Sequence, residues 1–439
     1  ALRDEVEIEL VDPKTETYSL TCQILAALYL GGDFALREAI RRRVRVIDWS
    51  REAVSPVTPF DNTEGIVSNA YLAHLRTDAT VQASPQTYTE SLKQALFMLS
   101  WLLTEKGFPP NLRFVSKLYS DPAFRAKVIA DVAEPDLRNY FAELERHMAR
   151  PTADALLRRF QHDLSFPEVR LSIGIPPASL RNILPAGSPR ITLGNYGSGM
   201  ALPASVGKER AAHRVTDVLL RAPRRNPKRP GLLFLEEAPT LLAGGSELVE
   251  PLTTAARTLR SVGFGVVFCG QDVANALPGP MVRTLQLNTW WWAIFRSHEE
   301  ADWIYPHLLV DEAGAALSEG DRQKEFRRLM VGLPSRKYFL HVKGEPALPM
   351  RAPTVNDPSV MAKRSEAELL EVFRREIASV SMVPAKTAAD LIARFEADVV
   401  DRATIPPAPP KKAAPKGAAP VRGIADLLRM MGGSPGTGA

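Results

Sequence analysis

The chain has 439 residues, of which 45% are apolar and 24% are charged, and its formal net charge is +5. This composition is ordinary for a globular protein, and no apolar run approaches the ~20 residues of a membrane-spanning helix. The two cysteines, Cys22 and Cys269, lie in apolar runs, and the seven histidines show no metal-ligand spacing. A disulfide framework and a histidine–cysteine metal site are therefore not expected, whereas the small positive charge is compatible with a nucleic-acid partner.

The chain begins with a predicted strand, a helix and a second strand. Apolar residues alternate from Glu5 to Val11, which predicts a strand that Asp12-Pro13-Lys14 ends. A helix is expected from about Glu16 to Leu30, closed by Gly31-Gly32. The second strand is expected within Arg41 to Trp49.

A long helical block follows. From Tyr71 to about Asp163 the apolar spacing is helical, and no strand candidate interrupts it. Pro122 and Pro135 each stand in the first turn of a predicted helix, where proline is tolerated. An all-helical block between strands of an α/β sheet predicts an inserted domain, in whose core we expect Phe97 and Trp101.

Strand-like sequence returns at Glu168 to Ile175 and at Ser188 to Leu193. A helix is expected from Lys208 to Arg221, and a basic, proline-rich loop from Arg221 to Pro230 follows it. This loop either contacts phosphate backbones or is a solvated loop at the amino end of the next strand.

The most informative stretch runs from Gly231 to Pro239. Four apolar residues, Leu232 to Leu235, predict a strand buried on both faces, and Glu236 and Glu237 stand at its end. Ligands of open parallel sheets bind at the carboxyl ends of the strands. One carboxylate of such a pair can support Mg²⁺ through its water shell, and the other can orient a water that attacks a γ-phosphate. Taken alone, a buried strand that ends in two solvated acids is an equal alternative.

Two further apolar runs strengthen the functional interpretation. A helix-like stretch, Glu250 to Leu259, leads to a strand at Gly265 to Gly270 that ends at Gln271. A third apolar run, Thr289 to Phe295, ends at Arg296. Three successive buried strands that end in Glu-Glu, Gln and Arg are hard to explain by packing alone.

The remaining elements are expected to be less central. The three rings of Trp290-Trp291-Trp292 are interpreted as core, because alternate residues of a strand face opposite surfaces. Tyr338 to Val342 is expected to be a final strand at the sheet edge. After Pro358 the chain is expected to be peripheral, with helices at Ser365 to Ile377 and Ala385 to Val399.

The C-terminal tail differs in composition from the rest of the chain. Ile405 to Pro420 is rich in Pro, Ala and Lys and is expected to be disordered or extended. A short apolar helix is expected at Ile424 to Met431. This motif is either a peptide that docks on a partner or a featureless tail.

These motifs resemble the FtsK/HerA superfamily of hexameric P-loop ATPases, and most closely its type IV secretion coupling-protein branch, which pumps DNA in bacterial conjugation. The resemblance spans roughly Glu5 to Pro353 and is most specific between Leu232 and Arg296. The family's Walker B strand usually ends in Asp-Glu, where this chain has Glu236-Glu237. The other matching stretches are the arginine-rich Ala256 to Gly263, the sensor position Gln271, Asn288-Thr289 and Phe295-Arg296.

The resemblance implies a role for each candidate residue. Glu237 would polarise the attacking water, Glu236 would help to hold Mg²⁺ through water, and Gln271 would sense the γ-phosphate. Arg260, or with less support Arg257, would act on the neighbouring subunit's nucleotide as an arginine finger. The resemblance also implies that Asp12, Lys14 and Arg296 contribute to nucleotide binding, and that the cofactors are ATP and Mg²⁺.

One expected motif is missing from the sequence. No Gly-x-x-x-x-Gly-Lys-Ser/Thr loop occurs, and Gly207-Lys208 is followed by Glu209. In the family this loop directly precedes the strand that Glu5 to Val11 resembles. Either Ala1 begins a fragment whose loop lies upstream, which the non-Met start favours, or the protein has lost the loop and does not hydrolyse ATP. This chain alone is expected to bind ATP poorly.

The sequence therefore predicts an α/β fold with a RecA-like, mainly parallel sheet, helices on both faces and an inserted all-α domain. The expected divisions are residues 1–70 and 166–357 for the ATPase core, 71–165 for the insertion, 358–400 for peripheral helices and 401–439 for the tail.

By resemblance, the function is that of an ATP-driven DNA translocase subunit in a homohexameric ring. The ring would contact the backbone of the DNA, without sequence specificity. Further expected partners are a secretion channel or membrane component and a docking partner for residues 424–431. The expected location is the cytoplasm, at the inner face of the membrane if an N-terminal anchor exists. The alternatives are a non-hydrolysing ring subunit and a HerA-like motor in DNA repair or phage defence.

Overall fold

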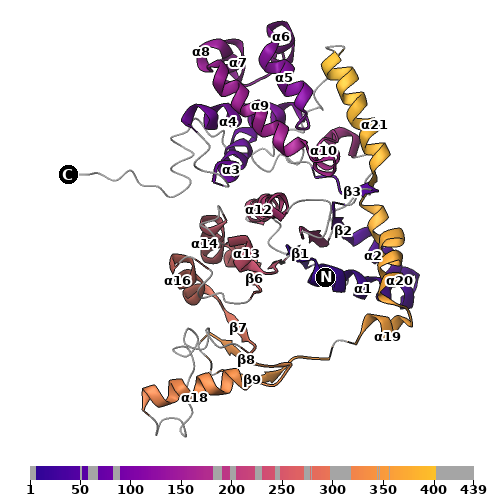
Figure 1. The fold of residues 1–439 in the computed structure, drawn as a ribbon, viewed down its shortest axis with the longest axis vertical. Coiled ribbons are helices and arrows are strands. Elements are labelled where there is room, and N and C mark those ends of the chain that lie inside the picture. The colour runs from indigo at the N-terminus through magenta and orange to yellow at the C-terminus, as the bar shows by residue number, and fades with distance from the viewer. Residues whose placement is uncertain are drawn as a thin grey trace, which may run out of the picture.

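The computed structural model describes residues 6–49, 52–57, 68–82, 89–180, 190–197, 204–222, 230–242, 248–270, 277, 279–296, 318–343, 345, 347–354 and 356–401 (Figure 1). Gln271, most of the basic loop before Pro230 and the apolar motif at 424–431 lie outside these residues. In the part of the chain that is described, no helix is both long and apolar enough to cross a membrane.

A five-stranded parallel sheet forms the centre of the molecule. Its spatial order is β2-β4-β1-β5-β6. The strands are β1 (Glu7–Asp12), β2 (Val44–Ile47), β4 (Ile191–Asn195), β5 (Gly231–Leu235) and β6 (Phe264–Phe268). Ile8 of β1 lies opposite Ile191 on one side and Leu232 on the other, which places the predicted acid-bearing strand beside the first strand.

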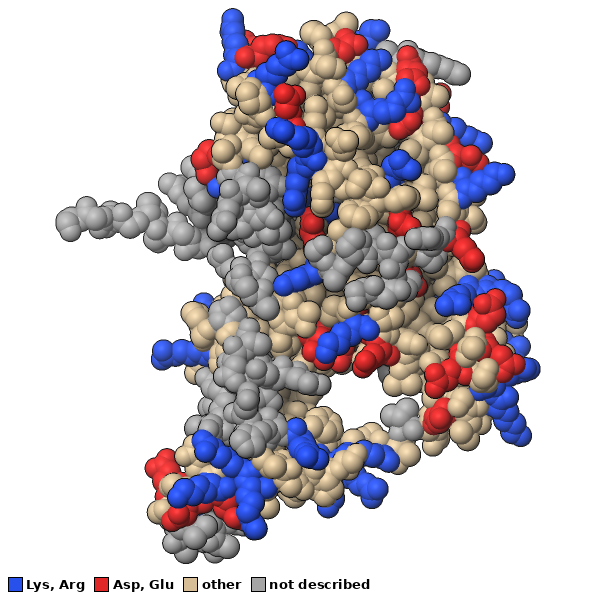
Figure 2. Space-filling view, in the orientation of Figure 1, with Lys and Arg blue, Asp and Glu red and all other residues tan. Residues whose placement is uncertain are grey.

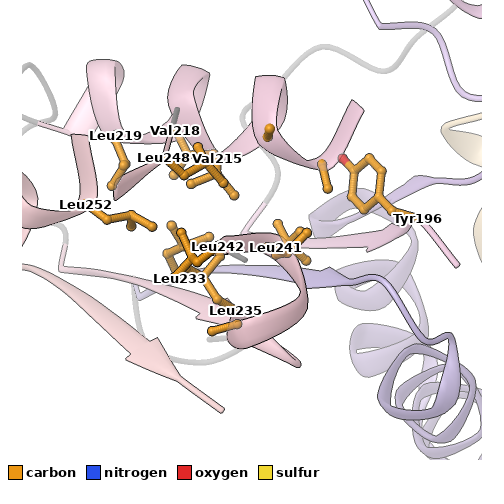
Figure 3. Packing of buried hydrophobic residues seen from close by; sticks show 14 of the residues in the cluster. Tyr196, Val215, Val218, Leu219, Leu233, Leu235, Leu241, Leu242, Leu248 and Leu252 are labelled. Carbon is orange, nitrogen blue, oxygen red and sulfur yellow. The ribbon is translucent and has the colours of Figure 1, made fainter. Parts of the chain in front are cut away.

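Helices cover both faces of this sheet, because successive side chains of each strand point to opposite faces. Leu233 and Leu235 of β5 face the layer formed by α12 (Ala204–Arg221), α13 (Ala238–Leu242), α14 (Val249–Thr258) and α16 (Gly279–Asn288). Figure 3 shows Val215, Val218 and Leu219 of α12 above these two leucines. Phe234 faces the other layer, which contains α1 (Glu16–Gly31) and α2 (Phe34–Arg43). The predicted α/β class, with a parallel sheet between helices, is confirmed.

A block of helices stands above the sheet in Figure 1 and has its own hydrophobic core. Its helices are α3 (Asn69–Gln82), α4 (Glu90–Lys106), α5 (Leu112–Ser120), α6 (Pro122–Ile129), α7 (Pro135–Ala142), α8 (Leu144–His147) and α9 (Arg150–Leu164). The next helices, α10 (Pro167–Ile173) and α11 (Pro177–Leu180), bury their apolar residues in other clusters. Phe97 and Trp101 pack against this core while partly buried. The strand expected at Glu168 to Ile175 is wrong, because Pro167 starts a helix whose buried Val169 and Ile173 are four residues apart.

The C-terminal helices are not peripheral, contrary to the sequence prediction. They are α19 (Pro358–Ala362), α20 (Glu366–Val372), the short turns η6 (Phe373–Ile377) and η7 (Ala378–Val380), α21 (Ala385–Phe395) and η8 (Glu396–Asp401). Leu369 and Phe373 are buried in the α1 layer of the sheet, whereas Phe395 and Val399 are buried in the core of the helical block. The two-residue strand β10 (Val383–Pro384) pairs with β3 (Ala53–Val54) between them. These helices, orange to yellow in Figure 1, join the two parts of the fold.

A separate antiparallel sheet lies below the main sheet in Figure 1. It has the order β7-β8-β9, formed by β7 (Trp291–Ile294), β8 (Lys337–Val342) and β9 (Leu348–Arg351), and α18 (Glu319–Val331) covers one face. The prediction that Thr289 to Phe295 forms a third strand of the main sheet is therefore wrong, and Tyr338 to Val342 is a central strand of this small sheet.

Two of the three consecutive tryptophans are not core residues. Trp290 and Trp291 are 51% and 45% exposed. Trp292 instead packs on α18 and also on the main core. The reason is the alternation of the strand: Trp292 and Ile294 point towards α18, so Trp291 points to the face that α18 does not cover.

Buried charges connect β1 to α12. The Arg214 guanidinium donates two hydrogen bonds of 2.7 Å to the carboxylate of Glu9, and Asp217 pairs with Arg214 and Arg221. The residue directly before Arg214 is His213, whose side chain is partly buried. Burial, and next the charge of Arg210, lowers the pKa of His213 to about 4.

The low pKa of His213 predicts acid sensitivity. An unfolded histidine has a pKa near 6.5, so between this value and about 4 the unfolded chain binds the extra proton and stability falls as the pH falls. Between pH 7 and pH 5 we expect His213 to account for about 2 kcal/mol of lost unfolding free energy. Urea unfolding at both pH values should show a smaller loss for His213→Gln. The exposed His147→Gln should behave as the wild type, and an equal loss in all three proteins would contradict the assignment.

Candidate active site

The turn after β5 is held between its two neighbouring strands. The Glu236 amide donates to the Val11 carbonyl of β1 (3.0 Å), and the Ala238 amide donates to the Cys269 carbonyl after β6 (2.8 Å). Within this turn, Glu237 has a φ of +46°. A non-glycine residue in the left-handed region is uncommon, and such conformations cluster at functional sites. The backbone therefore fixes the direction in which the carboxylate of Glu237 leaves the sheet.

Glu237 forms an ion pair with the loop that follows β1. The Lys14 Nζ lies 2.7 Å from Glu237 Oε1, and the Glu237 side chain is only 15% exposed. The hydrogen bond from Lys14 to Glu237 raises the pKa of Lys14 above its ordinary value. The structure thus brings together Lys14 and Glu237, which the sequence analysis assigned to separate roles.

Glu236 lies in a more crowded environment than Glu237. Burial, and next the charge of Asp12, raises the pKa of Glu236 above its ordinary value. The Cys269 thiol and the Thr17 hydroxyl hydrogen-bond to the Glu236 carboxylate and oppose this rise. Burial, together with the charge of Glu236, raises the pKa of Cys269 to about 12, so this half-buried thiol stays protonated. The negative charge of the carboxylates at this site therefore exceeds the positive charge of Lys14, which is the described cation there. This excess favours the binding of a further cation.

Asp12 has a structural task at the start of α1. Its carboxylate is fully buried and accepts hydrogen bonds from the amides of Lys14 (2.7 Å), Thr15 (2.9 Å) and Tyr18 (2.7 Å). Three otherwise unpaired amides at a helix start are satisfied in this way. Nucleotide binding by Asp12 remains a prediction from the resemblance.

The turn after β4 contributes residues that the sequence analysis missed. The Thr15 hydroxyl donates to Asn195 Oδ1 (3.2 Å), and the Gly197 amide donates to the same oxygen (3.2 Å). A Cβ on Gly197 would collide with the Thr15 side chain, so only glycine fits there. Asn195 is the polar residue that ends β4. The rule that singled out Glu236, a polar group at the carboxyl end of an apolar strand, would have found it.

The remaining predicted site residues are not assembled around the acid pair. Arg257 is exposed on α14, where its Nη2 donates to Thr284 Oγ1 of α16 (3.3 Å). Arg296 follows β7 and is exposed in the small antiparallel sheet. The side chain of Arg260 and all of Gln271 lie outside the described residues. The structure thus brings Asp12, Lys14, Glu236 and Glu237 together.

These residues suit a hydrated cation better than one bound directly by protein ligands. Among the described residues, no group of three or more His, Cys, Asp or Glu side chains is arranged to hold a metal ion. Mg²⁺ commonly keeps several waters and takes one or two carboxylates, and Glu236 offers a partly buried carboxylate beside Glu237. The described residues do not form a complete phosphate-binding site, because Lys14 is paired with Glu237 and the sequence has no glycine-rich phosphate loop.

No protein-family profile and no curated protein matches this sequence. Solved structures that resemble the fold include the unbound bacterial conjugative coupling protein TrwBdeltaN70, which is 13% identical with a TM-score of 0.45 over 80% of this chain and 79% of that chain. The plasmid coupling protein TrwB in complex with the ATP analogue ADPNP is 14% identical, with a TM-score of 0.41 over 80% and 79% of the two chains. VirB4 of Thermoanaerobacter pseudethanolicus is 12% identical, with a TM-score of 0.45 over 80% and 90%.

Proposed function

We propose that this chain acts as an ATP-driven DNA translocase subunit that works in a ring, as in type IV secretion and conjugation. The observation that carries the proposal is the pair Glu236 and Glu237 at the carboxyl end of β5. The pair is locked between β1 and β6, and Glu237 is held at positive φ beside Lys14. The sequence resemblance between Leu232 and Arg296 gives this geometry its chemical interpretation.

The two carboxylates would have different catalytic roles, because their surroundings differ. Glu237 reaches Lys14 and is the carboxylate suited to orient a water and accept its proton. Glu236 is hydrogen-bonded by Cys269 and Thr17, which orients it as an acceptor for the water shell of Mg²⁺. When bound, MgATP supplies the phosphoanhydride bond that is hydrolysed. Lys14 must leave Glu237 before that carboxylate can act, so the ion pair corresponds to a resting state.

DNA as the transported partner is supported by the resemblance and by the net charge of +5. Contacts to the phosphate backbone would hold any sequence, as a translocase requires. A secretion-channel or membrane partner and docking by residues 424–431 belong to the same proposal. The HerA-like motor of repair or defence shares the whole catalytic arrangement and differs only in its partners.

A non-hydrolysing ring subunit is the second candidate, and two specific observations favour it. Lys14 neutralises the proposed catalytic carboxylate, and no phosphate-binding loop occurs in the sequence. Such a subunit would keep the fold and contribute residues to its neighbour's site. Phosphate release from MgATP, measured with and without DNA, separates the two candidates.

The arginine finger can be tested by its dependence on assembly. Arg260→Ala should abolish hydrolysis only in assembled rings, because a finger acts on the neighbour's nucleotide and is worth roughly 10³–10⁵ in rate. Arg257→Ala tests the alternative finger, whose Nη2 donates to Thr284 Oγ1 within its own chain, and it should leave hydrolysis unchanged if Arg260 is the finger. Phosphate release should be measured on ring fractions isolated by size. Normal hydrolysis by Arg260→Ala rings would remove Arg260 from this role.

A further inference from the structure

Most of the net positive charge of the chain lies in the segment that forms α18, β8 and β9. Residues 318–354 carry eight Lys and Arg but only four Asp and Glu, whereas the net charge of the whole chain is +5. Figure 2 shows Lys and Arg side chains gathered over α18 and along β9, at the bottom of the molecule. The charge that is compatible with a nucleic-acid partner is therefore concentrated in one part of the fold.

Three cations form a row at one end of the small antiparallel sheet. Lys337, the first residue of β8, lies directly opposite Arg351, the last residue of β9. The register of β7 with β8, continued by two residues, places Arg296 on the other side of Lys337. The ring of Phe295 stacks on Tyr338 with centroids 5.0 Å apart, which agrees with this alignment. Because neighbouring strands are about 4.8 Å apart, the row is about 10 Å long.

This row is electrostatically unfavourable for the protein by itself. Lys337 and Arg351 point to the same face of the sheet, because residues directly opposite each other in an antiparallel pair share a face. Like charges at such positions destabilise a sheet. Arg296, Lys337 and Arg351 are all exposed, and within the ranges that the structure describes none of the three pairs with an acidic residue. A bound polyanion would remove the repulsion between them.

A fourth cation is fixed beside the row. Arg336 has a φ of +68°, in the left-handed region that residues other than glycine seldom adopt. Its Nη2 donates to the Ala352 carbonyl (3.3 Å) and to Thr354 Oγ1 (2.8 Å), and its own carbonyl accepts from the Ala352 amide (2.8 Å). These bonds hold the guanidinium next to the end of β9. Backbone conformations of this kind cluster at functional sites.

The arrangement fits a nucleic-acid strand better than it fits a membrane. A nucleic acid carries its phosphate charges along a line, as these cations are arranged, whereas anionic lipid headgroups are spread over a plane. The residue before Arg296 is Phe295, which is 50% exposed. Exposed aromatic rings beside a basic surface bind single strands, because every base can stack on them.

We propose that Arg296, Arg336, Lys337 and Arg351 bind the phosphate backbone of single-stranded DNA, with Phe295 as the platform for a base. The choice of DNA rests on the proposed function, whereas the contact itself requires neither nucleotide nor hydrolysis. The proposal gives Arg296 a role other than the nucleotide contact that the resemblance implied. Backbone contacts carry no sequence information, so strands of unrelated sequence should bind equally well.

Binding of fluorescently labelled single-stranded DNA, measured without nucleotide over a range of salt concentrations, tests the row. For Lys337→Gln with Arg351→Gln we expect the Kd to rise at least ~10-fold, and the salt slope of log Kd to fall by about 0.7 for each lost phosphate contact. The matched control is Arg42→Gln with Arg146→Gln, which removes the same charge at side chains that are 76% and 78% exposed. Equal effects of the two double variants, or no effect of the first, would overturn the inference.

Thermal unfolding of the same proteins separates binding from a structural role. Removing two like charges that face each other relieves their repulsion, so Lys337→Gln with Arg351→Gln should melt at the temperature of the wild type or above it. A lower melting temperature together with weaker DNA binding would show that these cations support the fold, and it would overturn the inference.

The aromatic platform is tested by comparing two forms of DNA. Phe295→Ala should weaken the binding of single strands at least ~5-fold and leave the binding of duplex DNA unchanged, because paired bases cannot stack on the ring. An equal loss for both forms, or no loss for single strands, would remove Phe295 from the site.

Two further measurements identify the partner and keep this inference separate from the proposed function. Vesicles that contain phosphatidylserine should bind Lys337→Gln with Arg351→Gln as they bind the wild type. Loss of vesicle binding with unchanged DNA binding would assign the row to a membrane and overturn the inference. Weaker DNA binding by this variant, in a protein that hydrolyses no ATP, would sustain the inference and reject the proposed function. DNA-stimulated hydrolysis with unchanged DNA binding by the variant would have the opposite meaning.

Discussion

Glu237→Gln is expected to lower ATP hydrolysis at least ~100-fold while nucleotide affinity changes little. Glutamine keeps the shape of the side chain but cannot accept a proton from the attacking water. The backbone of the turn does not depend on this carboxylate, because it is held by the amides of Glu236 and Ala238. Affinity should therefore survive, and the loss should appear in the rate of turnover.

The measurement is phosphate release together with binding of a fluorescent ATP analogue. Glu371→Gln, which changes an exposed carboxylate on α20, is the matched control. Hydrolysis by Glu237→Gln at the rate of this control would show that Glu237 is not the base. An equal loss of affinity and rate would indicate instead that Glu237 serves binding, through its ion pair with Lys14.

Arg214→Met is expected to lower the free energy of unfolding by about 3–5 kcal/mol, because it leaves the buried Glu9 carboxylate without its partner. Burial by itself lowers the pKa of Arg214, yet the adjacent Glu9 carboxylate raises it above the ordinary arginine value. The pair is therefore charged in the folded state. It links the central strand β1 to α12, so its loss affects the sheet core.

Urea unfolding should be measured for Arg214→Met, for Arg221→Met and for the double variant Arg214→Met with Glu9→Gln. Arg221 is 43% exposed, and its removal should cost at most ~1 kcal/mol. The double variant should recover part of the loss, since no full charge then remains buried at that position. A loss for Arg214→Met no larger than that for Arg221→Met would contradict the account.

The sequence was sufficient for the elements whose signals are local. The four consecutive apolar residues of β5 predict a strand that is buried on both faces. The two acids that follow them in the sequence must then lie at the carboxyl end of this strand. The helical spacing after Tyr71 and the absence of strand candidates likewise predicted the helical block. These inferences depend on neighbouring residues in the chain, which the sequence displays directly.

The features that the sequence could not give depend on distant residues. The ion pair between Lys14 and Glu237 exists because β1 and β5 are adjacent, and strand order is not a local property. The C-terminal helices were expected to be peripheral, yet Phe373 and Phe395 each complete a core built elsewhere, which no local pattern displays. The apolar run before Arg296 resembled a third buried strand, but its place in a sheet depends on which edge it pairs with.

The most direct test of the central claim is phosphate release from MgATP by isolated ring fractions of the full-length protein, with and without DNA. The account predicts hydrolysis that DNA stimulates and that Glu237→Gln abolishes. No hydrolysis, even with DNA and assembled rings, would contradict the account and favour a non-hydrolysing ring subunit.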